Sequence, residues 1–270
     1  MVRAKSGTPG GNRLRLMREA SRKSQLEVEL DAHLGIGYLQ RVESGKVQRP
    51  ERETLERILS VLNARYTERR DVLEMFGYVV DAPLPNEAEI AWAVAVYEKE
   101  LSDVPFPAYL LDCGHRLLAW NRLAPRLFVF AGRGNDAVLH RASMIHMIYD
   151  ARYPVRLITA NPDVFFPAQM RALRYEMRLF HGEPWYKLLI EEMLGCPLFE
   201  EYWRRSEAEA DYHIPARPLV PIELKISDAG LLQFRLFSEP FAQDRRFRVI
   251  YFVPADGQTT QQCIAWLQAH

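Results

Sequence analysis

Apolar residues recur at helical spacing in short stretches between residues 12 and 78, with polar caps between them. Ser24 and Glu27 form a capping box, which predicts the start of a second short helix. Ser44-Gly45 follows the third stretch and places a glycine where helices often end. The apolar positions expected to pack this helix pair are Leu26, Val28, Leu30, Leu34, Leu39 and Val42. The pattern predicts an all-α domain of five short helices over 12–78, preceded by a flexible basic tail, 1–11.

The pattern changes after a proline-containing stretch, 79–87, which we interpret as a linker. Asn86 and Glu89 form a second capping box before a helix over 90–101. Two strands are expected within 107–121 and three near the end of the chain, in PIELKIS, LLQFRLFS and RRFRVIYFV. Helices are expected between these two groups, at roughly 121–130, 139–149, 162–181, 185–195 and 198–209. The second domain, 88–270, is therefore predicted to be α+β, with a five-stranded, mainly antiparallel sheet.

One helix of this domain carries a continuous apolar stripe. Its members follow spacings of three and four residues: Phe166, Met170, Leu173, Met177 and Phe180. Such a stripe either packs as solid core or lines a deformable, methionine-rich cavity for an apolar ligand. Periodicity does not distinguish these alternatives.

Composition narrows the class of protein only slightly. The formal net charge is zero, but residues 1–80 hold 15 Lys and Arg against 11 Asp and Glu, whereas the remainder holds 20 against 24. A basic N-terminal module on a more acidic body is typical of a domain that contacts phosphates. No apolar run long enough to cross a membrane and no secretory signal is evident, and the three cysteines are far apart. We therefore expect a reduced, cytoplasmic protein without membrane insertion.

Motifs of catalysis and metal binding are not apparent in the sequence. GxSxG and P-loop patterns are absent, and the Gly-x-Gly of residues 131–136 is interpreted as a loop. Cys113 and His115 flank a hairpin turn and are read as exposed turn residues rather than ligands. The expectation is a protein with no catalytic residues, no metal site and no cofactor.

The segment SQLEVELDAHLGIGYLQRVESG (24–45) resembles the XRE (Cro/phage-repressor-like) helix-turn-helix family, and the similarity extends over 12–78. In that family the start of the second helix and the early third helix meet DNA. The resemblance implies base contacts from Gln25, Ile36, Gly37, Gln40 and Arg41. It implies backbone contacts from Arg13, Arg15 and Arg18.

Two residues depart from the family pattern at the turn. Glu29 stands where the family has a small residue, usually alanine, and His33 stands where it has glycine. We expect both to distort the turn. The third helix also begins Gly35-Ile36-Gly37, which offers few side chains to base edges, so the domain is expected to depend partly on DNA shape.

PAYLLDCGHRLLAWNRLAPRLF (107–128), CPLFEEYWRR (196–205) and the closing strands are similar to the MmyB-like ligand-binding domain, in the same order. The resemblance implies a PAS-like fold, with helices over one face of a sheet around a pocket for a fatty acid or another apolar ligand. The residues predicted to line it are Trp120, Met144, Met147, Phe166, Met170, Met177 and Trp185. A carboxylate would need a cation or donors, and Arg122 and Arg174 are the candidates carried forward.

These expectations combine into a transcriptional regulator. It would bind double-stranded operator DNA as a homodimer and sense a small hydrophobic ligand. Two alternatives stay open: a protein-interaction regulator with a degenerate helix-turn-helix, and an enzyme hidden in the second domain.

Overall fold

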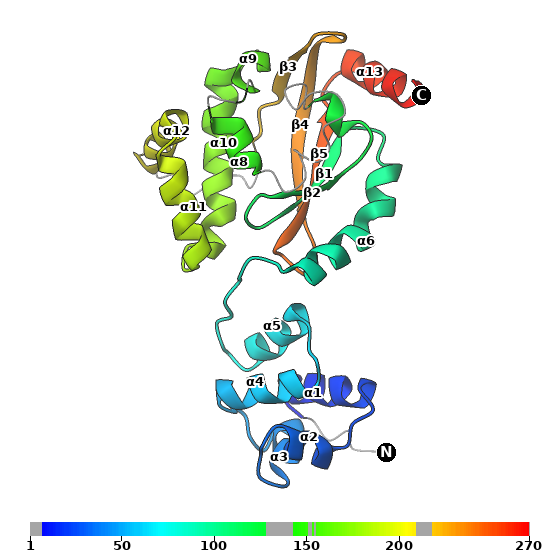
Figure 1. The fold of residues 1–270 in the computed structure, drawn as a ribbon, viewed down its shortest axis with the longest axis vertical. Helices are drawn as coiled ribbons and strands as arrows, with labels where there is room; N and C mark the ends of the chain where they lie inside the picture. Colours follow the sequence, from blue (N-terminus) through cyan, green and yellow to red (C-terminus); the bar gives the residue numbers. More distant parts are fainter. Residues whose placement is uncertain (1–6, 128–142, 151–152, 154, 209–217, 270) are drawn as a thin grey trace. The chain divides into compact units, whose positions relative to one another are not determined.

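The computed structural model describes residues 7–127, 143–150, 153, 155–208 and 218–269 (Figure 1). The chain forms two compact units that divide between Asp81 and Ala82. This division lies inside the stretch 79–87 expected as a linker. The Gly-x-Gly loop expected at 131–136 lies outside the described residues.

The first unit is a bundle of five short helices, as predicted. They are α1 (Pro9–Ala20), α2 (Gln25–Asp31), α3 (Tyr38–Glu43), α4 (Arg52–Val61) and α5 (Tyr66–Met75). The first helix begins earlier than expected, because the Thr8 hydroxyl caps it by accepting from the Gly11 amide and Pro9 occupies its first position. The stretch 1–11 is therefore not a tail throughout.

Thirteen apolar residues fill the core of this unit, among them Leu14, Val28, Leu39 and Val42. Two residues predicted to join them do not. Leu26 and Leu30 are 49% and 59% exposed, because they lie one turn apart on a face of α2 that points away from Val28.

The second unit contains a five-stranded antiparallel sheet, which confirms the predicted α+β class. Its strands are β1 (Ala108–Asp112), β2 (Leu117–Trp120), β3 (Ile222–Ile226), β4 (Gly230–Pro240) and β5 (Phe247–Pro254), in the order β2-β1-β5-β4-β3. The central strand β5 therefore pairs the early hairpin with the late one, across more than 100 residues of chain.

Helices cover both faces of the sheet, rather than the single face that the resemblance implied (Figure 1). On β5, Phe247 and Val249 pack in a cluster with Ile90, Ala93 and Leu101 of α6 (Glu87–Asp103). Ile250 and Phe252 alternate with them and belong to the larger cluster on the opposite face. The alternation along one strand thus separates two cores.

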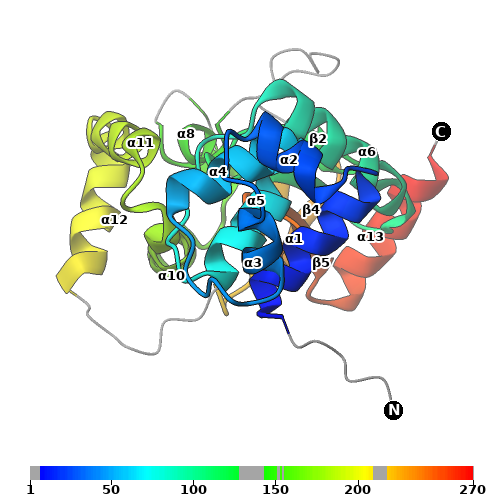
Figure 2. The ribbon, with the colours of Figure 1, turned by 90° about the horizontal axis from the view of Figure 1, so that it is seen from below.

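The second face is covered by the helices that follow β2. These are α8 (Met144–Tyr149), α9 (Val155–Ile158), α10 (Pro162–Met177), α11 (Pro184–Leu194) and α12 (Pro197–Ala208). Figures 1 and 2 show α11 and α12 lying together on the side of α10 away from the sheet. The stripe predicted on α10 and just beyond it is buried at every position, from Phe166 to Phe180.

Three elements differ from the prediction. The helix expected over 121–130 is a single 3₁₀ turn, Ala124–Arg126, as far as Leu127, where the described segment ends. The short α9 and the closing α13 (Gly257–Gln268) were not expected. The signal for α13 was present in Asp256, whose side chain accepts from the Thr259 amide at 2.7 Å and caps the helix.

Candidate DNA-binding face and ligand cavity

The turn between α2 and α3 is intact, contrary to the distortion expected from Glu29 and His33. His33 adopts φ 54°, the left-handed conformation for which glycine is usual at this place. The Glu29 carboxylate is 2% exposed and accepts from two amides at the start of α3, Gly37 N at 2.9 Å and Leu39 N at 2.8 Å. Gly37 has φ 80° and no side chain to cap the helix, so Glu29 supplies the cap from the preceding helix.

A buried carboxylate, Glu43, joins the first three helices. Its oxygens accept from Arg18 Nε at 2.7 Å, Arg18 NH2 at 3.0 Å and Gln25 Nε2 at 2.7 Å. Arg15 lies 3.5 Å from the same carboxylate and donates to the Glu43 carbonyl oxygen. The hydrogen bond to Glu43 raises the pKa of Arg18, so the guanidinium stays charged. The structure therefore places Gln25, Arg15 and Arg18, three predicted DNA-contacting residues, in an internal network, while Arg13 is half-buried.

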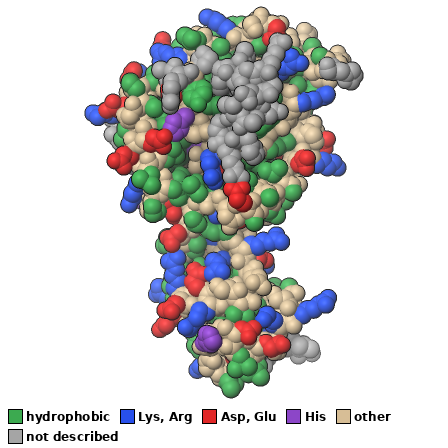
Figure 3. Space-filling model, viewed as in Figure 1, with side chains coloured by type: hydrophobic (Ala, Val, Ile, Leu, Met, Phe, Trp, Pro, Cys, Tyr) green, Lys and Arg blue, Asp and Glu red, His purple; other side chains and the backbone are tan. Residues whose placement is uncertain are grey.

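The remaining predicted DNA-contacting side chains are exposed. Ile36 is 82% exposed, and Gln40 and Arg41 lie on the outer surface of α3. The Arg41 guanidinium lies 5.5 Å from the Tyr38 ring centroid, within cation–π distance. Figure 3 shows apolar side chains at the end of the helical unit that carries α2 and α3.

The second unit contains an apolar cavity between the sheet and helices α8 and α10. Its volume is about 100 Å³, counted as the space that the centre of a water molecule can occupy. One buried water needs about 10–15 Å³ on that measure, so the cavity has room for several. The sheet contributes mainly Tyr109, Leu111, Ile222, Leu224, Leu236, Ile250 and Phe252. The helices contribute mainly Met144, Met147, Ile148, Phe165, Phe166 and Leu173.

Three of the nine predicted ligand residues, Met144, Met147 and Phe166, line this cavity. Met170 and Met177 are fully buried in the adjoining core and are not among the described lining residues. The remaining four lie elsewhere. Arg122 donates to the Leu267 carbonyl at 3.1 Å, Arg174 lies over the Trp203 ring at 4.4 Å, and Trp185 Nε1 donates to the Ala82 carbonyl at 2.9 Å.

Trp120 is half-buried beside the core, and the residue that follows it, Asn121, is buried. The buried Asn121 amide oxygen accepts from the Ala108, Leu123 and Ala124 amides, and its nitrogen donates to the Val104 and Phe106 carbonyls. Asn121 therefore ties the end of β2 to the start of β1. Its role is structural.

Besides Tyr109, the described lining includes four polar residues: His115, Gln169, Glu176 and Ser238. Sequence reasoning missed them, and it placed His115 and Cys113 in an exposed turn, whereas they are 7% and 0% exposed. Burial lowers the pKa of His115 well below its ordinary value, and the nearby Arg248 charge lowers it further, so the imidazole is neutral. Burial raises the pKa of Cys113 to about 12, so its thiol stays protonated. Within the described part of the chain, no cluster of three metal-ligating side chains occurs.

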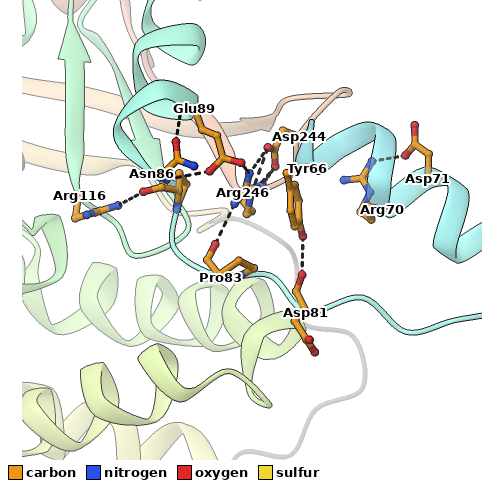
Figure 4. Close-up of polar contacts among 11 residues, drawn as sticks. Tyr66, Arg70, Asp71, Asp81, Pro83, Asn86, Glu89, Arg116, Asp244 and Arg246 are labelled. Atoms are coloured by element: carbon orange, nitrogen blue, oxygen red, sulfur yellow. Dashed lines mark hydrogen bonds and ion pairs between the residues drawn. The ribbon is translucent and has the colours of Figure 1, made fainter. Parts of the chain in front are cut away.

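The stretch that joins the two units is anchored on each side of the division. In the first unit, the Tyr66 hydroxyl donates to the Asp81 carbonyl at 3.0 Å. In the second unit, the buried Arg246 binds Asp244, Glu89 and the Pro83 carbonyl (Figure 4). Further contacts hold residue 82 of the same unit, because its amide donates to Glu183 at 2.6 Å and its carbonyl accepts from Trp185.

Comparison with known proteins agrees with this arrangement. A helix-turn-helix domain family matches residues 11–72, and the MmyB-like transcription regulator ligand binding domain family matches residues 100–265. One solved structure, titled "Structure of an RNA-binding Light-Oxygen-Voltage Receptor", is 12% identical. The match covers 96% of this chain and 63% of that one, and its TM-score of 0.26 carries no argument. No curated protein sequence matches the chain significantly.

The two units define a DNA-binding transcriptional regulator with a ligand-sensing domain. The chain belongs to the family of MmyB-like transcription regulators, since the match to the ligand-binding domain spans more than half of its length. Among the described helices, none is long and apolar enough to cross a membrane.

Proposed function

We propose that this regulator binds specific operator DNA as a homodimer in the cytoplasm, and that a small apolar molecule in the cavity changes its affinity for DNA. The observation that carries the proposal is the pairing of an exposed α3 surface with an apolar cavity in the ligand-binding domain.

The base-reading residues that we propose are Ile36, Gln40 and Arg41. Arginine pairs well with guanine O6 and N7, glutamine with adenine, and an exposed isoleucine with the thymine methyl group. Arg15 and Arg18 support this surface through Glu43, because their ion pairs hold α1 against the end of α3. Gln25 is held by the same carboxylate, so its proposed DNA contact requires a rearrangement of that hydrogen bond.

A selection from random duplex DNA, followed by fluorescence anisotropy, tests this part of the proposal. A recovered consensus, bound with a steep salt dependence, supports operator recognition. Arg41→Ala should weaken consensus binding by about 1–3 kcal/mol. Arg22→Ala is the matched control, since Arg22 is exposed after α1 and outside the proposed reading set. Failure to recover any consensus would favour a protein-interaction role for the apolar surface of Leu26, Leu30 and Ile36.

The ligand that we propose is a compact or short-chain apolar molecule. A cavity lined mainly by aliphatic, aromatic and methionine side chains removes apolar surface from water, at about 25 cal/mol per Å². A fatty acid is the ligand class that the family resemblance suggested, and its alkyl chain matches the apolar lining. Native mass spectrometry of the purified full chain tests occupancy directly. A co-purified apolar adduct lost from Phe166→Trp, which fills the cavity, supports the proposal.

Coupling between the units would pass through the anchored stretch. Glu183 and Trp185 lie at the start of α11 and hold residue 82, which directly follows the division of the units. A ligand that shifts α10 would move this anchor, because α11 follows α10 after a short 3₁₀ turn. Thermodynamic coupling is reciprocal, so operator DNA must change ligand affinity by the same factor.

A further inference from the structure

His115 and Gln169 each carry a buried polar atom that lacks a hydrogen-bond partner among the described residues, Nε2 and Oε1. Both residues line the cavity, and both atoms are inaccessible to solvent. His115 comes from the β1–β2 turn, where its backbone has φ 58° and its carbonyl accepts from the Met144 amide at 2.9 Å. The backbone of His115 thus joins the β1–β2 turn to the start of α8. A buried polar atom without a partner is costly, so each such atom in a native protein calls for a partner such as a water, an ion or a ligand group.

In the described part of the chain, one arginine and one glutamate beside the cavity form an ion pair. Arg248 is 3% exposed and pairs with Glu176, whose carboxylate also accepts from the Ser238 hydroxyl at 2.7 Å. No lysine or arginine is among the described lining residues. A carboxylate inside the cavity would therefore meet Glu176 as a like charge and find Arg248 already paired. Burial of an uncompensated charge is far costlier than burial of a hydroxyl that makes a hydrogen bond.

We infer that the ligand carries a neutral hydrogen-bonding group, a hydroxyl or an amide, which pairs with His115 and Gln169, rather than an ionised carboxylate. The inference rests on the proposed function, since it concerns the same cavity. A neutral imidazole offers one donor and one acceptor, and a carboxamide offers both. A hydroxyl or a primary amide can both donate and accept a hydrogen bond. It can therefore pair with either residue, whichever nitrogen of the His115 ring carries the proton and whichever way the Gln169 carboxamide is turned. The preference for a neutral group therefore does not depend on these assignments.

The test compares four probes of one chain length against the full-length protein by isothermal titration calorimetry. Octanol and octanamide carry the neutral group, octanoate carries a carboxylate that is ionised at about pH 8, and 1-chlorooctane has no donor. We expect octanol and octanamide to bind at least tenfold more tightly than octanoate. Octanol should also bind about fivefold more tightly than 1-chlorooctane, because one net hydrogen bond changes affinity by about that factor.

Two variants assign the contact. Gln169→Leu keeps the shape of the side chain on α10, and His115→Asn keeps a residue that tolerates the left-handed backbone. Each should reduce the fivefold preference for octanol over 1-chlorooctane, with little change in the affinity for 1-chlorooctane. Gln261→Leu, the same substitution at an exposed site on α13, is the matched control and should retain the full preference.

Glu176→Gln provides an independent check, because it leaves the Arg248 charge without its partner. Octanoate binding should improve at least tenfold in this variant, while octanol binding changes little. An unchanged octanoate affinity would show that Arg248 is not the cation that a carboxylate needs, and would count against the charge argument.

The outcomes separate the inference from the proposed function. If none of the four probes binds and no other apolar compound does, the proposed function fails. Octanoate binding as tightly as octanol in the unaltered protein overturns the inference alone, and so does equal affinity for octanol and 1-chlorooctane.

Discussion

Replacement of Glu29 by alanine tests the account of the helix-turn-helix. Glu29→Ala removes the carboxylate that caps α3 but retains a good helix former on α2. Alanine is also the residue that the resemblance led us to expect here. If the family pattern alone governed stability, this change would be neutral or favourable.

The structure predicts the opposite. Two amides lose a charged acceptor at 2.8 and 2.9 Å, and hydrogen bonds to charged groups contribute about 1.5–3 kcal/mol each. The Leu39 amide lies in a buried residue, so water replaces the carboxylate there poorly. The carboxylate no longer has to be desolvated, which offsets part of the loss. We expect a net destabilisation of the helical unit of about 2–3 kcal/mol, at or above the upper end for the loss of a cap.

Urea unfolding followed by two signals gives the measurement. All five tryptophans lie in the second unit, at 92, 120, 185, 203 and 266, so fluorescence reports that unit, whereas circular dichroism at 222 nm reports helices of both. Glu29→Ala should move the part of the dichroism transition that belongs to the helical unit and leave the fluorescence transition in place. Glu29→Gln should destabilise the helical unit by roughly half as much, because the oxygen of its amide still accepts a hydrogen bond.

Glu74→Ala is the control, since Glu74 is exposed on α5 and such changes usually stay within about 0.5 kcal/mol. A loss below about 0.5 kcal/mol in Glu29→Ala, or an equal loss in the control, would refute the capping role.

Three further predictions follow from particular contacts. Glu43→Ala leaves Arg18 without its buried partner and should cost the helical unit about 3–5 kcal/mol by the same urea assay, whereas a cost below about 1 kcal/mol would refute the network. Trp185→Phe removes the donor to the Ala82 carbonyl but keeps the ring against Phe180; ligand affinity should persist while the effect of ligand on DNA affinity shrinks, and undiminished coupling would contradict the proposed route. The pKa of His115 is lowered in the folded state, so its contribution to stability is present above the unfolded value of about 6.5 and is lost as pH falls below it, by up to about 1.4 kcal/mol per pH unit. His115→Asn should remove that part of the acid slope, and an unchanged slope would show that the ring titrates normally.

Local signals in the sequence predicted several elements correctly. The capping boxes at Ser24 and Asn86 are present as expected, and α10 begins at Pro162, where the helix over 162–181 was predicted to start. These signals involve residues three or four positions apart, so they can be read without knowledge of the fold. The closing helix was not predicted, because its cap, Asp256, lies only two residues after the end of β5 at Pro254.

The candidate site could be predicted only in part. Met144, Met147 and Phe166 were found from their apolar character, but Met170 and Met177 share the same stripe and pack as solid core. Helical spacing defines a buried face and cannot separate a filled interior from a cavity. Tyr109, Leu236 and Ile250 line the cavity because strands far apart in sequence pair in one sheet, and that pairing leaves no local signal.

Charged side chains were the least predictable. Arg122 and Arg174 were chosen for their position beside apolar residues, yet each binds a carbonyl outside the described cavity lining. Gln25 and Arg18 were chosen from the resemblance, yet both bind Glu43. The reason is the same in each case, because a long polar side chain pairs with whatever the fold brings near it.

The central claim is that ligand in the cavity controls DNA binding. It is tested most directly by operator affinity, measured by fluorescence anisotropy with the unaltered chain and with Phe166→Trp, each with and without saturating octanol. The account predicts a change of at least fivefold on adding octanol to the unaltered chain and none in the variant, with a coupling of about 1 kcal/mol or more. Equal operator affinity with and without bound octanol, when calorimetry shows that the cavity is filled, would contradict it.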